Sequence, residues 1–369
     1  MQRASIRKTM VTASLGVFTL LIVTVFPVLG QEASKHGKLS QDFHVKKLEL
    51  PDAKGLVVLD YFAYDDRRAR VWVPAGNLGV VAVIDGVTDK VTTVGGFGTG
   101  EVELLGKRRL MGPSSVSIGD GVAYIGNRGD SSICVIHAAT LALVGCSSVA
   151  DRTAGLAAAP DAVVYVATTK ELWVTTGAPP LGVPAADQSL LILDASDAKH
   201  LKQKAKLALG ASAEGYAVDE KRGLFYTNLE ERSETVAIDV RRKQIVSRWR
   251  SGCDEPHGLA LDKARRFIFV ACADRVIALD AARESKVLGS IATGDGLDNI
   301  DYSASEKKLY AAASIAGTLT IASVDDHGGM KTVATIPTVK GARSVIAGKR
   351  SSAYLIDPVG GSILKVDVR

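Results

Sequence analysis

Short stretches in which apolar and polar residues alternate follow one another along the chain from Phe43 to Arg369. One pattern recurs seven times: an apolar strand, a polar turn, a strand containing an aromatic residue, a second turn, and a strand ending in an apolar pair and Asp. The aromatic residues are Trp72, Tyr124, Trp173, Tyr226, Phe269, Tyr310 and Tyr354, and the endings are Asp85, His137, Asp194, Asp239, Asp280, Asp325 and Asp367. Alternation with a period of two, interrupted by turn residues, predicts β-strands, and the pattern shows no helical period.

Equivalent positions in successive repeats are 41 to 54 residues apart. Repeats of this length predict the four-stranded blades of a β-propeller, so we expect an all-β, seven-bladed propeller of antiparallel strands. The last repeat stops after its third strand, whereas Phe43–Pro51 form a strand outside any repeat. We therefore expect the N-terminal strand to complete the last blade and close the ring, because an open ring would leave sheet edges exposed.

The Asp that ends each third strand has a structural interpretation. Its carboxylate can accept hydrogen bonds from the backbone N–H groups of the turn that follows. We interpret His137, which replaces Asp in the second repeat, as a variant of the same turn.

The first strand of each blade lines the central channel of a propeller, so the residues that begin these strands form a ring around the axis. In chain order this axial ring consists of Asp60, Ser114, Ala162, Glu214, His257, Asp298 and Arg343. Turns between second and third strands lie at the same mouth and add candidate ligand contacts at Asn77, Asn127, Arg128, Asn228 and Asp274.

The axial ring is compatible with several kinds of chemistry. Asp60, Glu214 and Asp298 supply the oxygen ligands preferred by Ca²⁺, Mg²⁺ or Mn²⁺, with His257 as general acid or base of a metal-assisted hydrolase or lyase. Without a metal, Arg343 could hold a carboxylate or phosphate of a small polar ligand. The alternative is a hydrated channel in which these groups pair among themselves, Arg343 with Asp298 and Asp60.

Four cysteines occur at positions that suggest two disulfides. Cys134 and Cys146 fall on the third and fourth strands of one blade, close to opposite each other, and Cys253 and Cys272 fall near the same mouth of the ring. Buried thiols are the alternative for both pairs. No Cys or His spacing typical of zinc, haem or thiol redox sites occurs.

The strings EPHGLALDKARRFIFVACADRVIALDA and EGYAVDEKRGLFYTN, with their apolar-Asp endings, resemble the YVTN-type, YncE-like family of bacterial exported propellers. The resemblance extends over all seven repeats. It implies a propeller fold and a binding role. Propeller lactonases of related fold place acidic, His or Arg side chains around the channel, but no complete catalytic motif of those families matches this sequence.

The first thirty residues have the order of a secretory signal, with Arg3, Arg7 and Lys8 before an uncharged run from Met10 to Gly30. An uncleaved membrane helix is the alternative. We therefore expect a signal peptide (1–30), a linker (31–42) and one propeller domain (43–369), located in the periplasm or secreted, with no membrane span after cleavage. Lys and Arg number 45 against 40 Asp and Glu, with no basic cluster along the sequence, so nucleic acid is not an expected partner.

These observations predict a monomeric binding or interaction protein of the cell envelope that takes a small polar ligand, a metal or a protein partner at its axial mouth. The metal-assisted, lactonase-like hydrolase is the alternative. A third hypothesis is a scaffold that binds proteins through its rim or outer strands.

Overall fold

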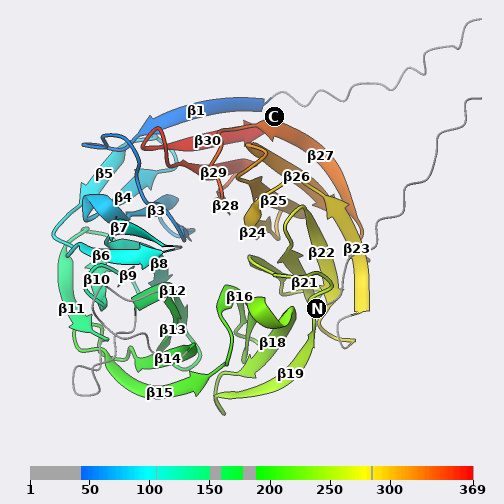
Figure 1. The fold of residues 1–369 in the computed structure, drawn as a ribbon, viewed down its shortest axis with the longest axis horizontal. Coiled ribbons are helices and arrows are strands. Elements are labelled where there is room, and N and C mark those ends of the chain that lie inside the picture. Colours follow the sequence, from blue (N-terminus) through cyan, green and yellow to red (C-terminus); the bar gives the residue numbers. More distant parts are fainter. Residues whose placement is uncertain (1–42, 105, 150–158, 178–187, 284–285, 369) are drawn as a thin grey trace, which may run out of the picture. The chain divides into compact units, whose positions relative to one another are not determined.

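The computed structural model describes residues 43–104, 106–149, 159–177, 188–283 and 286–368, which form a β-propeller of seven four-stranded antiparallel sheets (Figure 1). No α-helix occurs in these ranges. Their helical elements are two short 3₁₀ turns, η1 (Gly76–Leu78) and η2 (Glu230–Arg232). None of the described elements is a helix that could span a membrane. The predicted signal peptide and linker lie outside the described residues.

The first four blades each use four consecutive strands. Blade 1 contains β2 (Ala63–Asp65), β3 (Arg70–Ala75), β4 (Val80–Asp85) and β5 (Val91–Val94). Blade 2 contains β8 (Pro113–Gly119), β9 (Val122–Asn127), β10 (Ser132–His137) and β11 (Leu143–Ser148). Blade 3 contains β12 (Ala159–Val166), β13 (Glu171–Gly177), β14 (Ser189–Asp194) and β15 (Lys202–Ala208), and blade 4 contains β16 (Ala213–Asp219), β17 (Leu224–Leu229), β18 (Glu234–Asp239) and β19 (Gln244–Arg250).

The remaining blades continue this order until the ring closes. Blade 5 contains β20 (Leu259–Asp262), β21 (Phe267–Ala271), β22 (Arg275–Asp280) and β23 (Lys286–Ala292), and blade 6 contains β24 (Leu297–Ser303), β25 (Lys308–Ala313), β26 (Thr318–Val324) and β27 (Met330–Pro337). Blade 7 contains β28 (Val345–Ala347), β29 (Ser352–Asp357), β30 (Ser362–Val368) and, as its outer strand, β1 (Phe43–Glu49). The expected closure by the N-terminal strand is confirmed.

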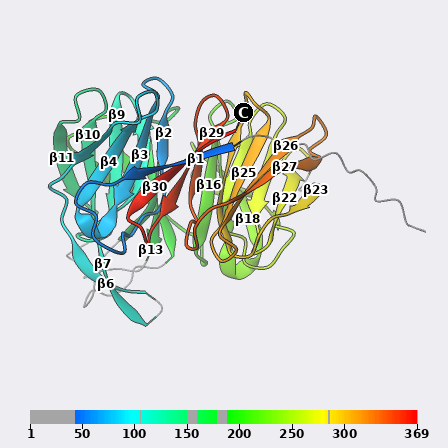
Figure 2. The same cartoon turned by 90° about the horizontal axis from the view of Figure 1, so that it is seen from above.

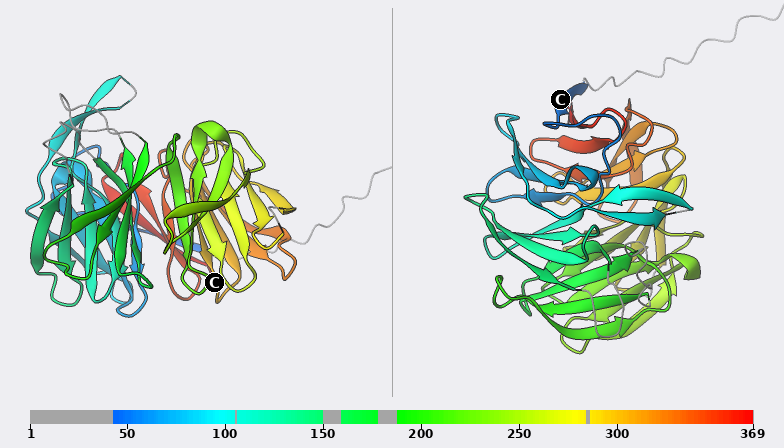
Figure 3. Two further views of the ribbon diagram at one scale, coloured as in Figure 1. Left: turned by 90° about the horizontal axis from the view of Figure 1, so that it is seen from below. Right: turned by 60° about the vertical axis from the view of Figure 1, so that its left-hand side comes forward.

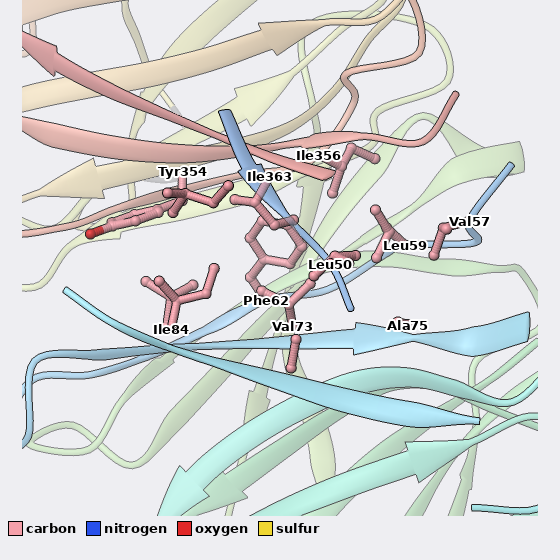
Figure 4. Packing of buried hydrophobic residues seen from close by; sticks show 13 residues of the cluster. Leu50, Val57, Leu59, Phe62, Val73, Ala75, Ile84, Tyr354, Ile356 and Ile363 are labelled. Carbon is pink, nitrogen blue, oxygen red and sulfur yellow. The ribbon is translucent and has the colours of Figure 1, made fainter. Parts of the chain in front are cut away.

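Aromatic side chains of the second strands form the centre of each blade. All seven predicted aromatics are buried, from Trp72 in β3 to Tyr354 in β29, with at most 1% of each exposed. Blades 7 and 1 share one of these apolar clusters, in which Phe62, Ile84 and Tyr354 pack between the sheets (Figure 4). Burial of apolar surface between neighbouring blades therefore stabilises the ring.

Turns after the third strands have the predicted structure. Backbone N–H groups donate to the carboxylates that end these strands, as in Arg241 to Asp239 at 2.9 Å and Val87 to Asp85 at 3.0 Å. In the second blade the N–H of Thr140 donates to Nδ1 of His137, so His137 is confirmed as a turn residue.

Both expected disulfides, Cys134–Cys146 and Cys253–Cys272, are present. Cys134 and Cys146 are directly opposite in the β10–β11 ladder. The second bridge joins the segment before β20 to the end of β21, across 19 residues of sequence.

Replacing both Cys253 and Cys272 by Ser is expected to lower the free energy of unfolding by about 2–4 kcal/mol, because the open chain gains entropy in its unfolded state. Urea unfolding of the oxidised proteins measures the difference. A reductant should lower the stability of the parent more than that of the double variant; equal effects on both would contradict a stabilising role for this bridge.

One hairpin departs from the repeat. Strands β6 (Gly100–Leu104) and β7 (Lys107–Met111) pair only with each other, between blades 1 and 2, and stand out from one face of the ring (Figure 2). The same face carries the turns between second and third strands. The other face, which we call the basal face, carries the turns that join first to second strands and third to fourth strands (Figure 3).

Candidate functional site

The inner strands bring the predicted axial residues around the channel at the face opposite the basal face. Glu214 and Asp298 are the second residues of β16 and β24. Asp60 precedes β2, between bridges that Leu59 forms with Ala75 and Tyr61 with Ser115. We call the charged and phenolic side chains gathered here the mouth cluster: Asp60, Tyr61, Arg128, Asp161, Glu214, Asp298 and Arg343.

Arg343 joins two carboxylates from different blades. Its Nη1 lies 3.0 Å from Oδ2 of Asp298, and its Nη2 lies 3.0 Å from Oδ2 of Asp60. The two arms of the guanidinium are therefore used within the protein, as in the self-pairing alternative of the sequence analysis. A ligand carboxylate or phosphate would have to compete with both acids for this side chain.

Burial changes the pKa of Asp60 more than the neighbouring Arg343 does. Desolvation raises the pKa of Asp60 to about 6, although Arg343 opposes this rise, and Asp161 adds to it by repulsion. The carboxylates in turn raise the pKa of Arg343, Asp60 more than the others, so the guanidinium stays charged. Asp60 consequently titrates near neutral pH although it has an ion-pair partner.

A second ion pair lies in blades 2 and 3. Nη2 of Arg128 is 2.6 Å from Oδ1 of Asp161, and these side chains are only 9% and 12% exposed. Comparison of the seven repeats had assigned Ala162, the next residue, to the axial ring in this blade. The register between β12 and β13 shifts between Pro160 and Val163, so Asp161 supplies the charged group of this blade while Ala162 is buried. Asp161 and Ala162 are neighbours in sequence, and the bulge decides which of the two side chains lies in the mouth cluster.

Glu214 differs from the other three carboxylates because no Lys, Arg or His of the described residues lies within ion-pair distance. Its Oε2 accepts a hydrogen bond from the hydroxyl of Tyr61 at 3.2 Å. Desolvation by burial, followed by repulsion from Asp161 and Asp298, raises its pKa well above the usual range. The ring of Tyr61 lies 5.8 Å from that of Tyr216, so aromatic surface adjoins this carboxyl group.

His257 lies at the edge of the cluster, where its Nδ1 is 3.9 Å from Oε1 of Glu230 in η2. Burial raises the pKa of Glu230, and His257 partly offsets the rise. Glu230, Tyr61 and Asp161 were absent from the sequence prediction. Tyr61 adjoins Asp60 in sequence, but nothing in the pattern showed that it would reach Glu214 across the channel.

The remaining predicted site residues form hydrogen bonds with backbone groups near the mouth. The Asn77 side chain accepts from Val58 N–H and donates to Leu56 O, while the Asn127 amide donates to Gly98 O. The Asn228 amide donates to His257 O at 2.6 Å. Ser114, which is 2% exposed, donates its hydroxyl to Pro160 O at 2.9 Å. Their polar atoms are therefore engaged with the loops that shape the mouth.

The predicted Ca²⁺, Mg²⁺ or Mn²⁺ site is not formed by Asp60, Glu214 and Asp298. Among the described residues, no group of three or more His, Cys, Asp or Glu side chains is arranged to hold a metal ion. The physical reason is Arg343, whose guanidinium already neutralises two of the three proposed ligands. Of the three proposed ligands, Glu214 is the one that has no cation partner among the described residues.

Comparisons with solved structures identify similar propellers. One chain of the structure titled "Crystal Structure of Mitotic Checkpoint Complex" matches with a TM-score of 0.69 and 11% identity, over 94% of this chain and 99% of that chain. The Cps50 (Swd1) beta-propeller domain of Myceliophteria thermophila matches with a TM-score of 0.65 and 10% identity, over 88% and 100%. No protein-family model and no curated protein sequence matches. At these identities the similarity shows the fold alone.

Proposed function

We propose that this chain is an exported cell-envelope propeller of the YVTN type that binds a small polar ligand at its axial mouth, and that the ligand carries a positively charged group. The observation that carries this proposal is Glu214, a carboxyl group among three other acids. Its hydrogen-bond partner is a phenol, and no cation of the described residues lies beside it.

The balance of charge in the mouth cluster supports a cationic ligand. Four carboxyl groups share two guanidinium groups, of which Arg343 serves Asp60 and Asp298 and Arg128 serves Asp161. A ligand ammonium or guanidinium group beside Glu214 would supply the missing counter-charge. The adjacent rings of Tyr61 and Tyr216 offer the aromatic surface that organic cations favour.

Export is supported by two features. The sequence of residues 1–30 is typical of a secretory signal, and two disulfides are typical of proteins in oxidising compartments. No specific observation favours the hydrolase or lyase over binding, because Arg343 pairs with two of the three predicted metal ligands.

Screening small amines and guanidines, for example putrescine, agmatine and choline, by thermal unfolding tests the proposal. A ligand at a hundred times its Kd stabilises a protein by about 2.7 kcal/mol, and we expect Glu214→Gln to abolish the stabilisation. Glu103→Gln is the matched control, since Glu103 is exposed on the β6–β7 hairpin. Stabilisation that survives in Glu214→Gln would refute this site.

The same variant has an expected effect on the ligand-free protein. Since the folded-state pKa of Glu214 is raised, this group contributes stability below its unfolded pKa, and that contribution is lost as pH rises through the folded pKa. A buried polar group without a partner lowers the free energy of unfolding by about 1–3 kcal/mol. Glu214→Gln removes such a charge, so it should raise the free energy of unfolding by about this amount at pH 8. The difference should shrink towards pH 5, which urea unfolding at both pH values measures. A destabilised Glu214→Gln at pH 8 would contradict the unpaired state of this carboxyl group.

Proton release provides a further readout of binding. If a cation binds the ionised form of Glu214, the raised pKa of this carboxyl group requires that a proton leave the site on binding. Calorimetric titrations in buffers of different ionisation enthalpy should therefore give different apparent heats for the parent.

A further inference from the structure

The basal face collects positive charge that is scattered along the sequence. Seven turns join the first and second strands of the blades, and together they contain eleven Lys and Arg but four Asp and Glu. These turns are residues 66–69, 120–121, 167–170, 220–223, 263–266, 304–307 and 348–351. Because each turn belongs to a different blade, the ring places them around the propeller axis on the basal face.

Three of these cations are structural. Arg68, Arg222 and Arg265 each pair with a buried Asp three residues earlier, at 3.0, 2.7 and 2.9 Å. The same geometry in three blades shows that these arginines belong to the fold and are neutralised by it.

Five further cations are not neutralised. They are exposed, and no ion pair or side-chain hydrogen bond engages them within the part of the chain that the structure describes. They come from five blades: Arg67, Lys170, Lys221, Lys263 and Arg350. A folded protein that leaves five cations unpaired around one opening presents a positive surface to its surroundings.

Most acids of these turns are engaged with neighbouring groups. Glu220 accepts the backbone N–H of Ala167 at 2.7 Å, and Asp120 accepts the hydroxyl of Tyr165 at 2.6 Å. Glu306 accepts the backbone N–H of Ser351 at 2.6 Å. Asp66, the remaining acid, is exposed and 3.9 Å from Lys349. The cations outnumber the acids in the turns between first and second strands, and five of them have no carboxylate partner among the described residues.

Two exposed apolar residues accompany these cations on the basal face. Val87, at the turn between β4 and β5, is 80% exposed on this face, and Val287 near the start of β23 is 54% exposed.

We propose that the basal face binds the anionic surface of a lipid bilayer, with the five free cations contacting headgroup phosphates and exposed apolar turn residues such as Val87 entering the interface. Short turns on this face permit close approach to a plane, while the β6–β7 hairpin projects from the opposite face (Figure 3). Docked in this way, the propeller would turn its axial mouth away from the membrane. This inference does not depend on the ligand proposed for the mouth.

Co-sedimentation with vesicles tests the proposal. The chain beginning at Gln31 contains every strand of the seven blades and lacks the apolar run, so any binding must come from the propeller or residues 31–42. We expect it to bind vesicles of equal parts phosphatidylglycerol and phosphatidylcholine and to dissociate from them as the salt concentration rises. It should not bind vesicles of phosphatidylcholine alone.

A charge-matched pair of variants locates the binding face. Arg67→Glu/Lys221→Glu on the basal face should weaken partitioning to the anionic vesicles at least about tenfold. Lys107→Glu/Arg109→Glu makes the same change of charge on the hairpin, where both side chains are also exposed, and should retain binding. Circular dichroism and thermal unfolding establish that both variants are folded.

Three results would overturn the proposal: no binding to the anionic vesicles, equal losses in the basal and hairpin variants, or binding to soluble polyphosphate without binding to vesicles. The last result would identify a polyanion site in place of a membrane surface.

Discussion

A chain that begins at Pro51 instead of Gln41 is expected not to fold cooperatively. Residues 43–49 form β1, the outer strand of blade 7, and all seven are paired with β30, from Phe43 opposite Val368 to Glu49 opposite Ser362. Leu48 and Leu50 are buried in the cluster shared by blades 7 and 1. Removing this segment opens the ring at the one blade that joins its two ends.

The expected loss exceeds that of ordinary core substitutions. Truncating one buried Leu costs about 2–5 kcal/mol, and the deletion removes two of them together with a complete ladder, which is comparable to the total stability of many domains. The unpaired edge of β30 should also promote aggregation. Expression in soluble form, circular dichroism and urea unfolding measure the outcome.

The control for this truncation is the chain that begins at Gln41, which retains β1. It should unfold with the same midpoint as the chain that begins at Gln31. If the Pro51 chain unfolds with an unchanged midpoint, strand β1 does not stabilise the ring.

Arg343→Met is expected to destabilise the protein by about 1–3 kcal/mol at pH 8. The substitution leaves Asp60 and Asp298 facing each other without their shared cation. Breaking a fully buried ion pair costs about 3–5 kcal/mol, and the smaller figure reflects the 41% exposure of the Arg343 side chain and the 33% exposure of Asp298.

The loss should be smaller at pH 5. With Arg343 present the pKa of Asp60 is about 6, and loss of the cation removes the interaction that opposes its rise. Asp60 is then protonated at pH 5 and needs no counter-charge, whereas at pH 8 it is driven towards ionisation without one. Urea unfolding of parent and variant at each pH gives the two differences.

Two further variants keep this prediction specific. Adding Asp60→Asn to Arg343→Met should recover part of the loss at pH 8, because the uncompensated charge is removed. Arg275→Met is the matched control, since Arg275 pairs with Asp274 at 2.7 Å but both side chains are about half exposed. A surface pair is worth at most about 1 kcal/mol, so a loss in Arg275→Met as large as that in Arg343→Met would exclude a special role for the mouth pairs.

Local patterns predicted the architecture because the repeat is encoded in every blade. The aromatic of each second strand, such as Trp72 or Tyr310, is buried as predicted. An Asp that ends a third strand, such as Asp85 or Asp239, accepts hydrogen bonds from backbone N–H groups two or three residues away in its own turn. Closure by Phe43–Glu49 followed from counting strands. These features depend on residues close in sequence or on alternation, both of which a sequence displays directly.

The mouth was predicted only in part. Alignment of the repeats assigned Asp60, Glu214, Asp298 and Arg343 to one ring. For the third blade it chose Ala162, whereas the structure has a bulge in β12 and Asp161 forms the ion pair with Arg128. A shift of one residue reverses which side chain faces the channel, and the register of an inner strand is decided by its pairing with the next strand. Asn77, Asn127 and Asn228 were chosen by position, but their amides support backbone.

The sequence by itself determined the seven repeats, the four strands of each blade and the closing strand, because periodicity and turn chemistry are local properties. It favoured the two cysteine pairs that the structure contains, with buried thiols as the alternative. Only the tertiary structure decided which charges meet. It joined Arg343 to Asp60 and Asp298 across blades, placed Glu214 beside Tyr61 with no ion-pair partner among the described residues, and gathered cations from five separate turns on the basal face. Electrostatic interactions depend on distance in space, and the ring brings together residues that lie hundreds of positions apart in the chain.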